Sequence, residues 1–99
     1  MIDLLNTIYE HDPNIVSRLI AGEMILVPIR KDVGDMESIY TLNETGARVW
    51  ELLDGRRSLA EIHQQLVREF DIDPFQAEQD LKELIDGLVE IGALVKRQA

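Results

Sequence analysis

The chain contains no cysteine among its 99 residues. Disulfide bonds, thiolate metal sites and cysteine nucleophiles are therefore excluded, and we expect a cytoplasmic protein without redox chemistry. No apolar run is long enough to cross a bilayer, and the first residues lack the basic start and the small-residue cleavage site of a signal peptide. The sequence therefore predicts neither a membrane span nor an export signal.

Positive charge is also scarce, because 10 basic residues stand against 19 acidic ones and the formal net charge is -9. Affinity for nucleic acid comes largely from cations that neutralise phosphates, so a chain this acidic repels that partner. The same charge disfavours binding to anionic membranes. We expect neither a nucleic acid nor a membrane as a partner.

Residues that carry enzymatic chemistry are few. His11 and His63 stand alone, and His63 has glutamines beside it rather than a carboxylate at the spacing of a metal site. No glycine-rich loop matches a phosphate cradle. The many carboxylates are better explained by solvated faces than by acid–base catalysis. The sequence predicts a protein that is not an enzyme and that binds no cofactor and no metal ion.

The residues that are present suit one globular domain, with 45% hydrophobic and 29% charged residues. In the first half, three segments favour β-strands: 15–20, 24–29 and 37–42. The sequence Ala21-Gly22-Glu23 predicts a hairpin turn between the first two. Pro28 cannot donate to a strand ladder, so it should mark a bulge or a strand end. We predict a three-stranded antiparallel meander.

The second half predicts three α-helices. Asn43 is a candidate cap for the first helix, and Ser58 opens the second with a capping-box pattern. Asp73 followed by Pro74 opens the third helix, which Gly92 ends. The order of elements gives an α+β fold that resembles a winged helix, with the meander followed by the helices.

The chain ends are predicted to pack onto a single domain at residues 13–99. Residues 1–12 form an N-terminal arm in which four apolar residues would share one side of a short helix: Leu4, Leu5, Ile8 and Tyr9. The arm either straps the core of its own chain or contacts a second copy in a homodimer, and we favour the strap because termini need tying down. Residues 93–95 form a short final strand or simply pack down.

The third predicted helix carries two apolar stripes. The main stripe should face the core and consists of Ala77, Leu81, Leu84, Leu88 and Ile91. The second stripe lies about 120° round the helix and consists of Phe75, Ile85 and Val89, with Glu78 and Lys82 between them. Either the second stripe packs as further core, or it lines a groove beside the third strand.

The third predicted strand, residues 37–42, has one free edge in the meander. Proteins usually blunt such edges, but this one carries only Glu37 as a charge and has no proline. A peptide can add to a free edge as a further strand, with backbone bonds giving affinity and side-chain pockets giving selectivity. A terminus or a second subunit could cover the edge equally well.

Three stretches resemble the motifs of the PqqD-like family: Leu42-Asn43-Glu44-Thr45, Trp50 to Gly55 and Ile91-Gly92-Ala93-Leu94. These proteins, named after a protein of coenzyme PQQ biosynthesis, are small peptide chaperones also called RiPP recognition elements. The resemblance runs from about residue 15 to residue 95 and implies a winged-helix-type fold. It further implies binding of a precursor peptide's leader segment and its presentation to a modifying enzyme, typically of the radical SAM type.

In the family, the leader adds as a strand to the third strand, in a groove walled by the third helix. Carried over to this chain, the resemblance implies backbone pairing along Ser38, Ile39, Tyr40, Thr41 and Leu42. The candidate peptide-binding residues of the helix are Phe75, Glu78, Lys82, Ile85 and Val89.

Two alternatives to peptide binding remain. The chain could be a structural subunit that dimerises through its free edge or its arm. It could also be a winged-helix DNA-binding regulator, but the reading helix of such a protein should be basic, and here Lys82 is the only cation of the third helix. DNA binding is therefore the weakest of the three hypotheses.

Overall fold

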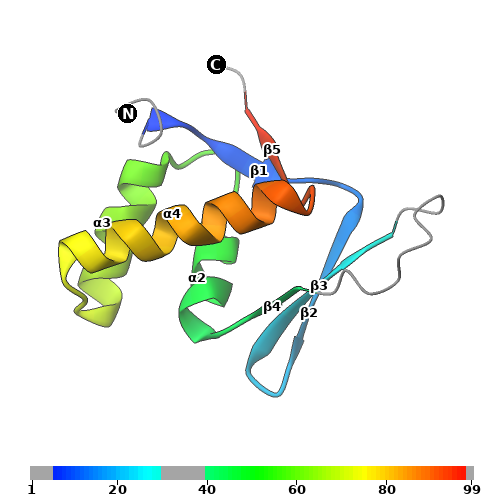
Figure 1. Cartoon of the computed structure of the whole chain (residues 1–99), viewed down its shortest axis with the longest axis horizontal. Helices are drawn as coiled ribbons and strands as arrows, with labels where there is room; N and C mark the ends of the chain where they lie inside the picture. Colours follow the sequence, from blue (N-terminus) through cyan, green and yellow to red (C-terminus); the bar gives the residue numbers. More distant parts are fainter. Residues whose placement is uncertain (1–5, 30–39, 98–99) are drawn as a thin grey trace.

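The computed structural model describes residues 6–29 and 40–97. The elements are β1 (Tyr9–His11), β2 (Ile15–Ile20), β3 (Glu23–Pro28), β4 (Tyr40–Leu42), α2 (Glu44–Leu52), α3 (Leu59–Phe70), α4 (Pro74–Glu90) and β5 (Leu94–Lys96). Helix α2 lies between α3 and the larger sheet, and α4 crosses the molecule in front of it (Figure 1). The predicted α+β architecture, a three-stranded antiparallel sheet followed by three helices, is confirmed.

The larger sheet has the order β2-β3-β4, with β3 in the middle. Ala21 and Gly22 connect β2 to β3 with positive φ angles of 52° and 84°. Two successive residues in this region make the tight turn whose twist matches that of the flanking strands. Pro28 is the last residue of β3, so the predicted strand end is confirmed.

All three helices begin at their predicted caps. The Gly46 amide donates a hydrogen bond of 2.8 Å to Oδ1 of Asn43 at the start of α2. Ser58 and Glu61 form the reciprocal capping box of α3, and Asp73 accepts from amides in the first turn of α4. Each cap gives a partner to amides that have none inside the helix.

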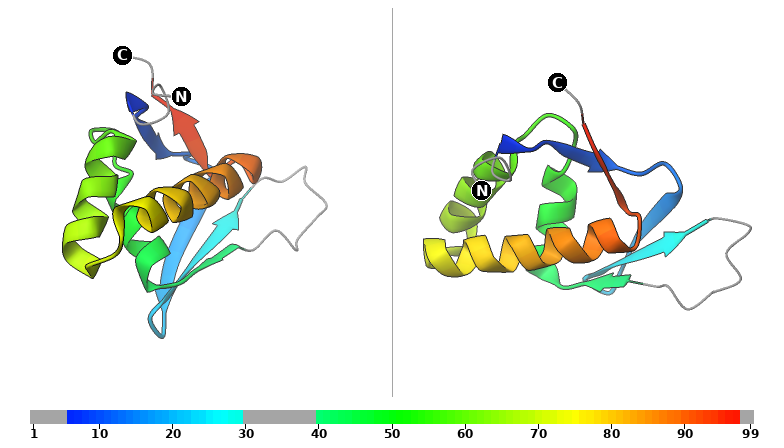
Figure 2. Two further views of the ribbon diagram at one scale, coloured as in Figure 1. Left: turned by 60° about the vertical axis from the view of Figure 1, so that its left-hand side comes forward. Right: turned by 45° about the horizontal axis from the view of Figure 1, so that its top comes forward.

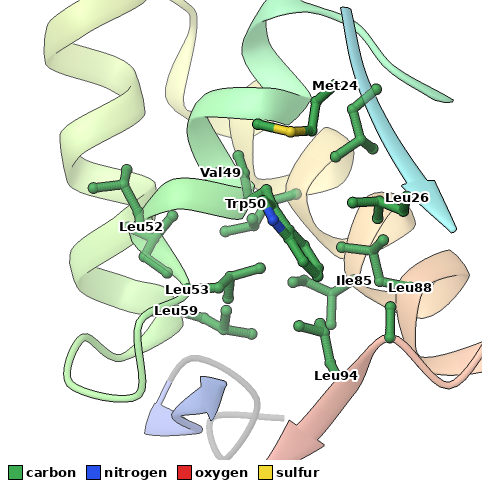
Figure 3. Packing of buried hydrophobic residues seen from close by; sticks show 14 of the residues in the cluster. Met24, Leu26, Val49, Trp50, Leu52, Leu53, Leu59, Ile85, Leu88 and Leu94 are labelled. Atoms are coloured by element: carbon green, nitrogen blue, oxygen red, sulfur yellow. The ribbon is translucent and has the colours of Figure 1, made fainter. Parts of the chain in front are cut away.

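The core forms around Trp50 of α2, whose exposed fraction is 2%. Figure 3 shows the indole ring among aliphatic side chains from the sheet and from α4, including Leu26, Ile85 and Leu88. Full burial of such an aliphatic side chain contributes about 1.5–3 kcal/mol. The core therefore fixes β3, α2 and α4 relative to one another, and it includes Leu42 of β4, whose exposed fraction is also 2%.

A second sheet consists of β1 and β5, which pair in antiparallel register from Tyr9 opposite Lys96 to His11 opposite Leu94. The two strands lie side by side in Figures 1 and 2. On its other side, β1 accepts a hydrogen bond of 3.1 Å from the Gly55 amide to the Tyr9 carbonyl. The short helix predicted to include Tyr9 is therefore wrong for that residue, whereas the predicted final strand is confirmed.

The described part of the N-terminal arm packs on its own chain. The rings of His11 and Trp50 stack with centroids 3.7 Å apart and an angle of 6° between their planes. Nε2 of His11 also lies 2.7 Å from the Trp50 carbonyl oxygen, within hydrogen-bond distance. These contacts agree with the predicted strap over the core, while the division of the chain at residue 12 stays a prediction.

Candidate functional site

Strand β4 lies at the edge of the larger sheet, and its outer side has no partner strand within the ranges that the structure describes. Of the five residues predicted to pair with a peptide, the sheet contains Tyr40, Thr41 and Leu42. Ser38 and Ile39 lie outside the described residues. The candidate edge therefore consists of the last three residues of the predicted strand.

The direction of the backbone groups of β3 follows from its ladder with β2. Beyond the last pair of this ladder, the Ile29 amide donates to the Asn14 carbonyl at 2.8 Å. Because hydrogen-bonded and non-bonded pairs alternate in an antiparallel ladder, the neighbouring pair of Ile15 and Pro28 is non-bonded. Pro28 has no amide hydrogen, so its position at a non-bonded pair costs the ladder with β2 nothing.

The same alternation continues along β3, so Met24 and Leu26 direct their backbone groups toward β4. They lie opposite Leu42 and Tyr40, respectively. Thr41 lies between these two pairs and must therefore direct its own amide and carbonyl toward the open edge. An added peptide strand would find a free donor and a free acceptor on this residue.

A cavity of about 660 Å³ opens beside this edge. Its volume is in the range of roughly 300–1,000 Å³ that is typical of ligand pockets. The residues that line it come from β4, all three helices and the turns that adjoin them: Tyr40, Thr41, Leu42, Asn43, Thr45, Gly46, Val49, Leu66, Ile72, Asp80, Leu81, Glu83 and Leu84.

The cavity has an apolar base and a polar rim. The most deeply buried lining residues are aliphatic and come from four elements: Leu42, Val49, Leu66 and Leu81. The exposed lining residues carry hydroxyl, amide or carboxylate groups: Thr41, Asn43, Asp80 and Glu83. The hydroxyl-bearing Thr45 is half-buried. A strand laid on β4 could thus bury an apolar side chain while its backbone stays hydrogen-bonded.

Tyr40 marks one end of the cavity, where its side chain lies on α4 at Gly87. A Cβ atom at Gly87 would be only 2.6 Å from the Tyr40 hydroxyl oxygen, which is closer than two such atoms can approach. Glycine therefore permits this contact. A glycine inside a predicted helix is the one sequence signal of a close approach here.

The five helix residues predicted to bind peptide do not line this cavity. Ile85 has an exposed fraction of 1% and belongs to the core. The other four are exposed on α4, and Phe75 has an exposed fraction of 79%. The predicted position of Ile85 on an open wall is therefore wrong, because the core takes this side chain.

Helical phase explains where the cavity lies instead. At 100° per residue, Asp80, Glu83 and Leu84 lie on one flank of the buried stripe of α4, and the predicted wall residues lie on the other flank. Leu84, which the main stripe predicts to face the core, is half-buried against the core and also lines the cavity. Asp80 and Glu83 are exposed lining residues.

The rim of the cavity is negatively charged. Asp80 and Glu83 are its charged residues, and no lysine or arginine lines it within the described part of the chain. Asp80 Oδ1 accepts a hydrogen bond of 2.9 Å from the Gln76 side chain, which is neutral. The nearest cation on the helix, Lys82, lies 3.8 Å from Asp86.

The helices that wall the cavity are joined by polar contacts. Arg48 of α2 donates to both carboxylate oxygens of Glu69 of α3, at 2.9 and 2.8 Å. Hydrogen bonds from Arg48 and then from Gln65 lower the pKa of the Glu69 carboxyl to about 2. Nε2 of His63 lies 2.7 Å from the Pro74 carbonyl oxygen, which links α3 to the start of α4.

Residues 6–29 and 40–97 contain no candidate metal site and no candidate membrane span. No three histidine, aspartate or glutamate side chains gather there in a way that could hold a metal ion. No helix in these ranges has the length and apolar character needed to cross a membrane.

Comparison with known proteins identifies relatives of the chain. The family model for coenzyme PQQ synthesis protein D (PqqD) matches residues 23–94. Proteins called PqqA binding protein from Xanthomonas euvesicatoria pv. vesicatoria (strain 85-10) and Xanthomonas axonopodis pv. citri (strain 306) are each 44% identical over 52 residues. These residues are 52% of this chain and 56% of either relative, so the chain spans just over half the length of the curated relatives it matches.

Two solved structures have a similar fold. "TbiB1 in Complex with the TbiA(beta) Leader Peptide" gives a TM-score of 0.73 at 23% identity, over 91% of this chain and 99% of that one. "Lasso peptide synthetase B1 complexed with the leader peptide" also gives 0.73, at 26% identity over 88% and 96% of the two chains. Since the PqqD family model matches more than two-thirds of the residues, the chain belongs to the PqqD family.

Proposed function

We propose that this chain is a peptide-binding module that holds the leader segment of a ribosomally made precursor peptide. The observation that carries this proposal is the open edge of β4 beside the cavity, where Thr41 directs a free donor and acceptor outward. Family membership, the name of the PqqA binding relatives and the leader peptides in the two similar structures support it. In this role the module presents the leader to a modifying enzyme, for which we propose a radical SAM enzyme.

Binding by strand addition would use the backbone and the cavity together. The backbone of the leader would extend the sheet beyond β4, and alternate side chains would point toward the cavity. Backbone bonds give affinity without sequence preference, so the apolar base would supply the selectivity. The proposal requires no catalysis by the module itself, and it includes action in the cytoplasm, where ribosomal precursors are made.

An NMR titration with the leader peptide of a candidate precursor tests this proposal. Changes in amide chemical shift should cluster at Tyr40–Leu42 and at cavity residues such as Thr45 and Leu84. The amide signal of Phe75, on the opposite flank of α4, should not change. The variant Thr41→Pro removes the outward donor and should abolish binding, and Thr41→Ala should retain it. Shifts on the Phe75 flank, or equal binding by the proline variant, would contradict strand addition at β4.

A second candidate function is self-association, because the same open edge could pair with β4 of another copy. A solution mass measurement separates the two functions. A monomer whose mass does not change with concentration would exclude a structural dimer, whereas a dimer dissociated by Thr41→Pro would establish one. DNA binding stays the weakest hypothesis, because the net charge is -9 and the cavity rim is acidic.

A further inference from the structure

We infer that the groove selects a leader segment that carries a lysine or arginine side chain, which Asp80 and Glu83 bind at the rim. This inference rests on the proposed function, since the cavity and the β4 edge position the peptide. The two carboxylates then decide which peptides fit. The pattern that we expect in the peptide is an apolar residue and a basic residue two positions apart.

The first step is the placement of the carboxylates. Asp80 and Glu83 are three residues apart on α4, so their side chains are neighbours on one face of the helix. Both line the cavity whose opposite wall is β4. Any strand that pairs with Thr41 would therefore run between the sheet and this acidic face.

The second step is that the described structure gives these carboxylates no cationic partner. Its ion pairs join Arg48 to Glu51 and Glu69, Arg57 to Asp54, and Lys82 to Asp86. Asp80 accepts a hydrogen bond from the neutral side-chain amide of Gln76, and no cation of the described residues pairs with it. Two neighbouring carboxylates repel each other, and a ligand cation between them would relieve that repulsion.

The third step is the shape that surrounds them. Leu66 and Leu81 lie at the base of the cavity, and Leu84 lies half-buried beside Glu83. Lysine and arginine have long apolar stems that pack along such a surface while the charged head stays near water. Side chains two positions apart in a strand point to the same face. One such position can fill the apolar base while the next one reaches the acidic rim.

The charge of the whole chain acts in the same direction. A net charge of -9 attracts a basic peptide and repels an acidic one during encounter, and added salt weakens both effects. Selectivity at the rim can be separated from this general attraction, because the selectivity depends on Asp80 and Glu83, whereas the attraction depends on the net charge. A matched pair of variants separates the two contributions.

The test is selection of binders from a phage-displayed library of random nonapeptides on the immobilised full chain. The rim variant is Asp80→Asn with Glu83→Gln, and the control is Asp86→Asn with Glu90→Gln. Both remove two charges from exposed positions of α4, but the control residues do not line the cavity. The wild type and the control should enrich peptides with lysine or arginine two positions from an apolar residue, and the rim variant should not.

A synthetic copy of the best binder gives the quantitative measurement. Replacing its basic residue with glutamine should weaken binding to the wild type about five-fold, the size expected for a partly exposed pair of charges. The same replacement should change binding to the rim variant less than two-fold, about the scatter of a weak surface contact.

The outcomes separate this inference from the proposed function. Three outcomes would overturn the rim selectivity alone, provided that Thr41→Pro still abolishes binding. The selected peptides could lack a preference for lysine or arginine. That preference could also survive in the rim variant, or it could be lost equally in the control variant. If the library yields no enriched sequence, or if the Thr41→Pro variant still binds the selected peptides, both strand addition and the rim selectivity would be overturned.

Discussion

At the scale of single residues, one missing side chain shapes the cavity. Gly87 lies inside α4, where glycine is about 0.5–1 kcal/mol less favourable than alanine. Its lack of a Cβ atom lets the Tyr40 hydroxyl lie against the helix. The helix gives up local stability at this position, and the tyrosine side chain gains a fixed place at the end of the cavity.

The variant Gly87→Ala tests this arrangement. We expect the urea midpoint to stay level or rise, because alanine favours the helix and only the flexible end of Tyr40 must move. Leader affinity should fall several-fold in a fluorescence titration, since the displaced ring changes the cavity end. Adding Tyr40→Phe should restore binding, because the nearest remaining ring atom lies 3.4 Å from the new methyl group, an ordinary contact. Unchanged affinity in the single variant would mean that Tyr40 does not shape the site.

Two neighbouring residues of α4 show why the sequence alone does not predict which flank of the helix lines the groove. Leu84 and Ile85 are both apolar and adjacent, and helical phase places them on opposite sides of the buried stripe. The phase alone does not say on which side the sheet lies. That depends on how α4 crosses α2 and β3, so the prediction chose Ile85 for the groove, and the structure gives that position to Leu84.

At the scale of elements, the joint between α2 and α3 predicts a pH dependence. Hydrogen bonds from Arg48 and then from Gln65 lower the pKa of Glu69 from 4.5 to about 2. A carboxyl whose pKa is lowered by folding stabilises the fold above its unfolded pKa and loses that effect as the pH falls through its folded pKa. The stabilisation by Glu69 is therefore complete above about pH 5 and declines toward pH 2.

Thermal unfolding of Glu69→Gln at a series of pH values measures this effect. The variant should melt below the wild type at pH 7, and the two melting temperatures should converge as the pH falls from about 4.5 toward 2. The control variant Glu90→Gln changes an exposed residue of α4, and its melting temperature should follow that of the wild type at every pH. A constant gap between Glu69→Gln and the wild type would show that the pair with Arg48 does not set the acid stability.

A substitution at the edge of the sheet should cost less stability than a substitution in the core. Thr41→Pro removes an outward amide hydrogen and leaves the bonds from β4 to β3, so it should cost less than about 1–2 kcal/mol. Trp50→Ala removes the centre of the core and should cost about 3–5 kcal/mol, a large part of the stability of a domain this size. Urea denaturation measures both, and equal losses would indicate that the edge of β4 is not free.

Local patterns predicted most elements well because their causes are local. The side chain of Asn43 caps a helix through an amide three residues away, and Ala21-Gly22 turns the chain by its own backbone angles. Tyr9 departs from the predicted helix for the opposite reason. Its strand exists because it pairs with β5 near the other end of the chain, and no nearby residue reveals that partner.

At the scale of the whole molecule, the first and last strands close the fold over the core. Strand β1 lies between β5 and the loop from α2 to α3, where the Leu59 amide also donates to the Thr7 carbonyl at 3.0 Å. His11 at the end of β1 covers the ring of Trp50. We therefore propose that the predicted arm and the predicted domain unfold as one cooperative unit.

Removal of residues 1–11 tests that unit, with His11→Ala as a smaller change at the same contact. His11→Ala should lower the free energy of unfolding by about 1–2 kcal/mol, because it removes the stacked rings and the hydrogen bond. The truncation should lower it further, because it also removes the strand that pairs with β5. Trp50 is the single tryptophan of the chain, so its fluorescence reports both losses without interference. We expect red-shifted emission and one unfolding transition at lower urea in the truncated protein. If truncation instead left the emission and the midpoint unchanged, residue 12 would be a true boundary, and the stack on Trp50 would add nothing to the stability of the domain.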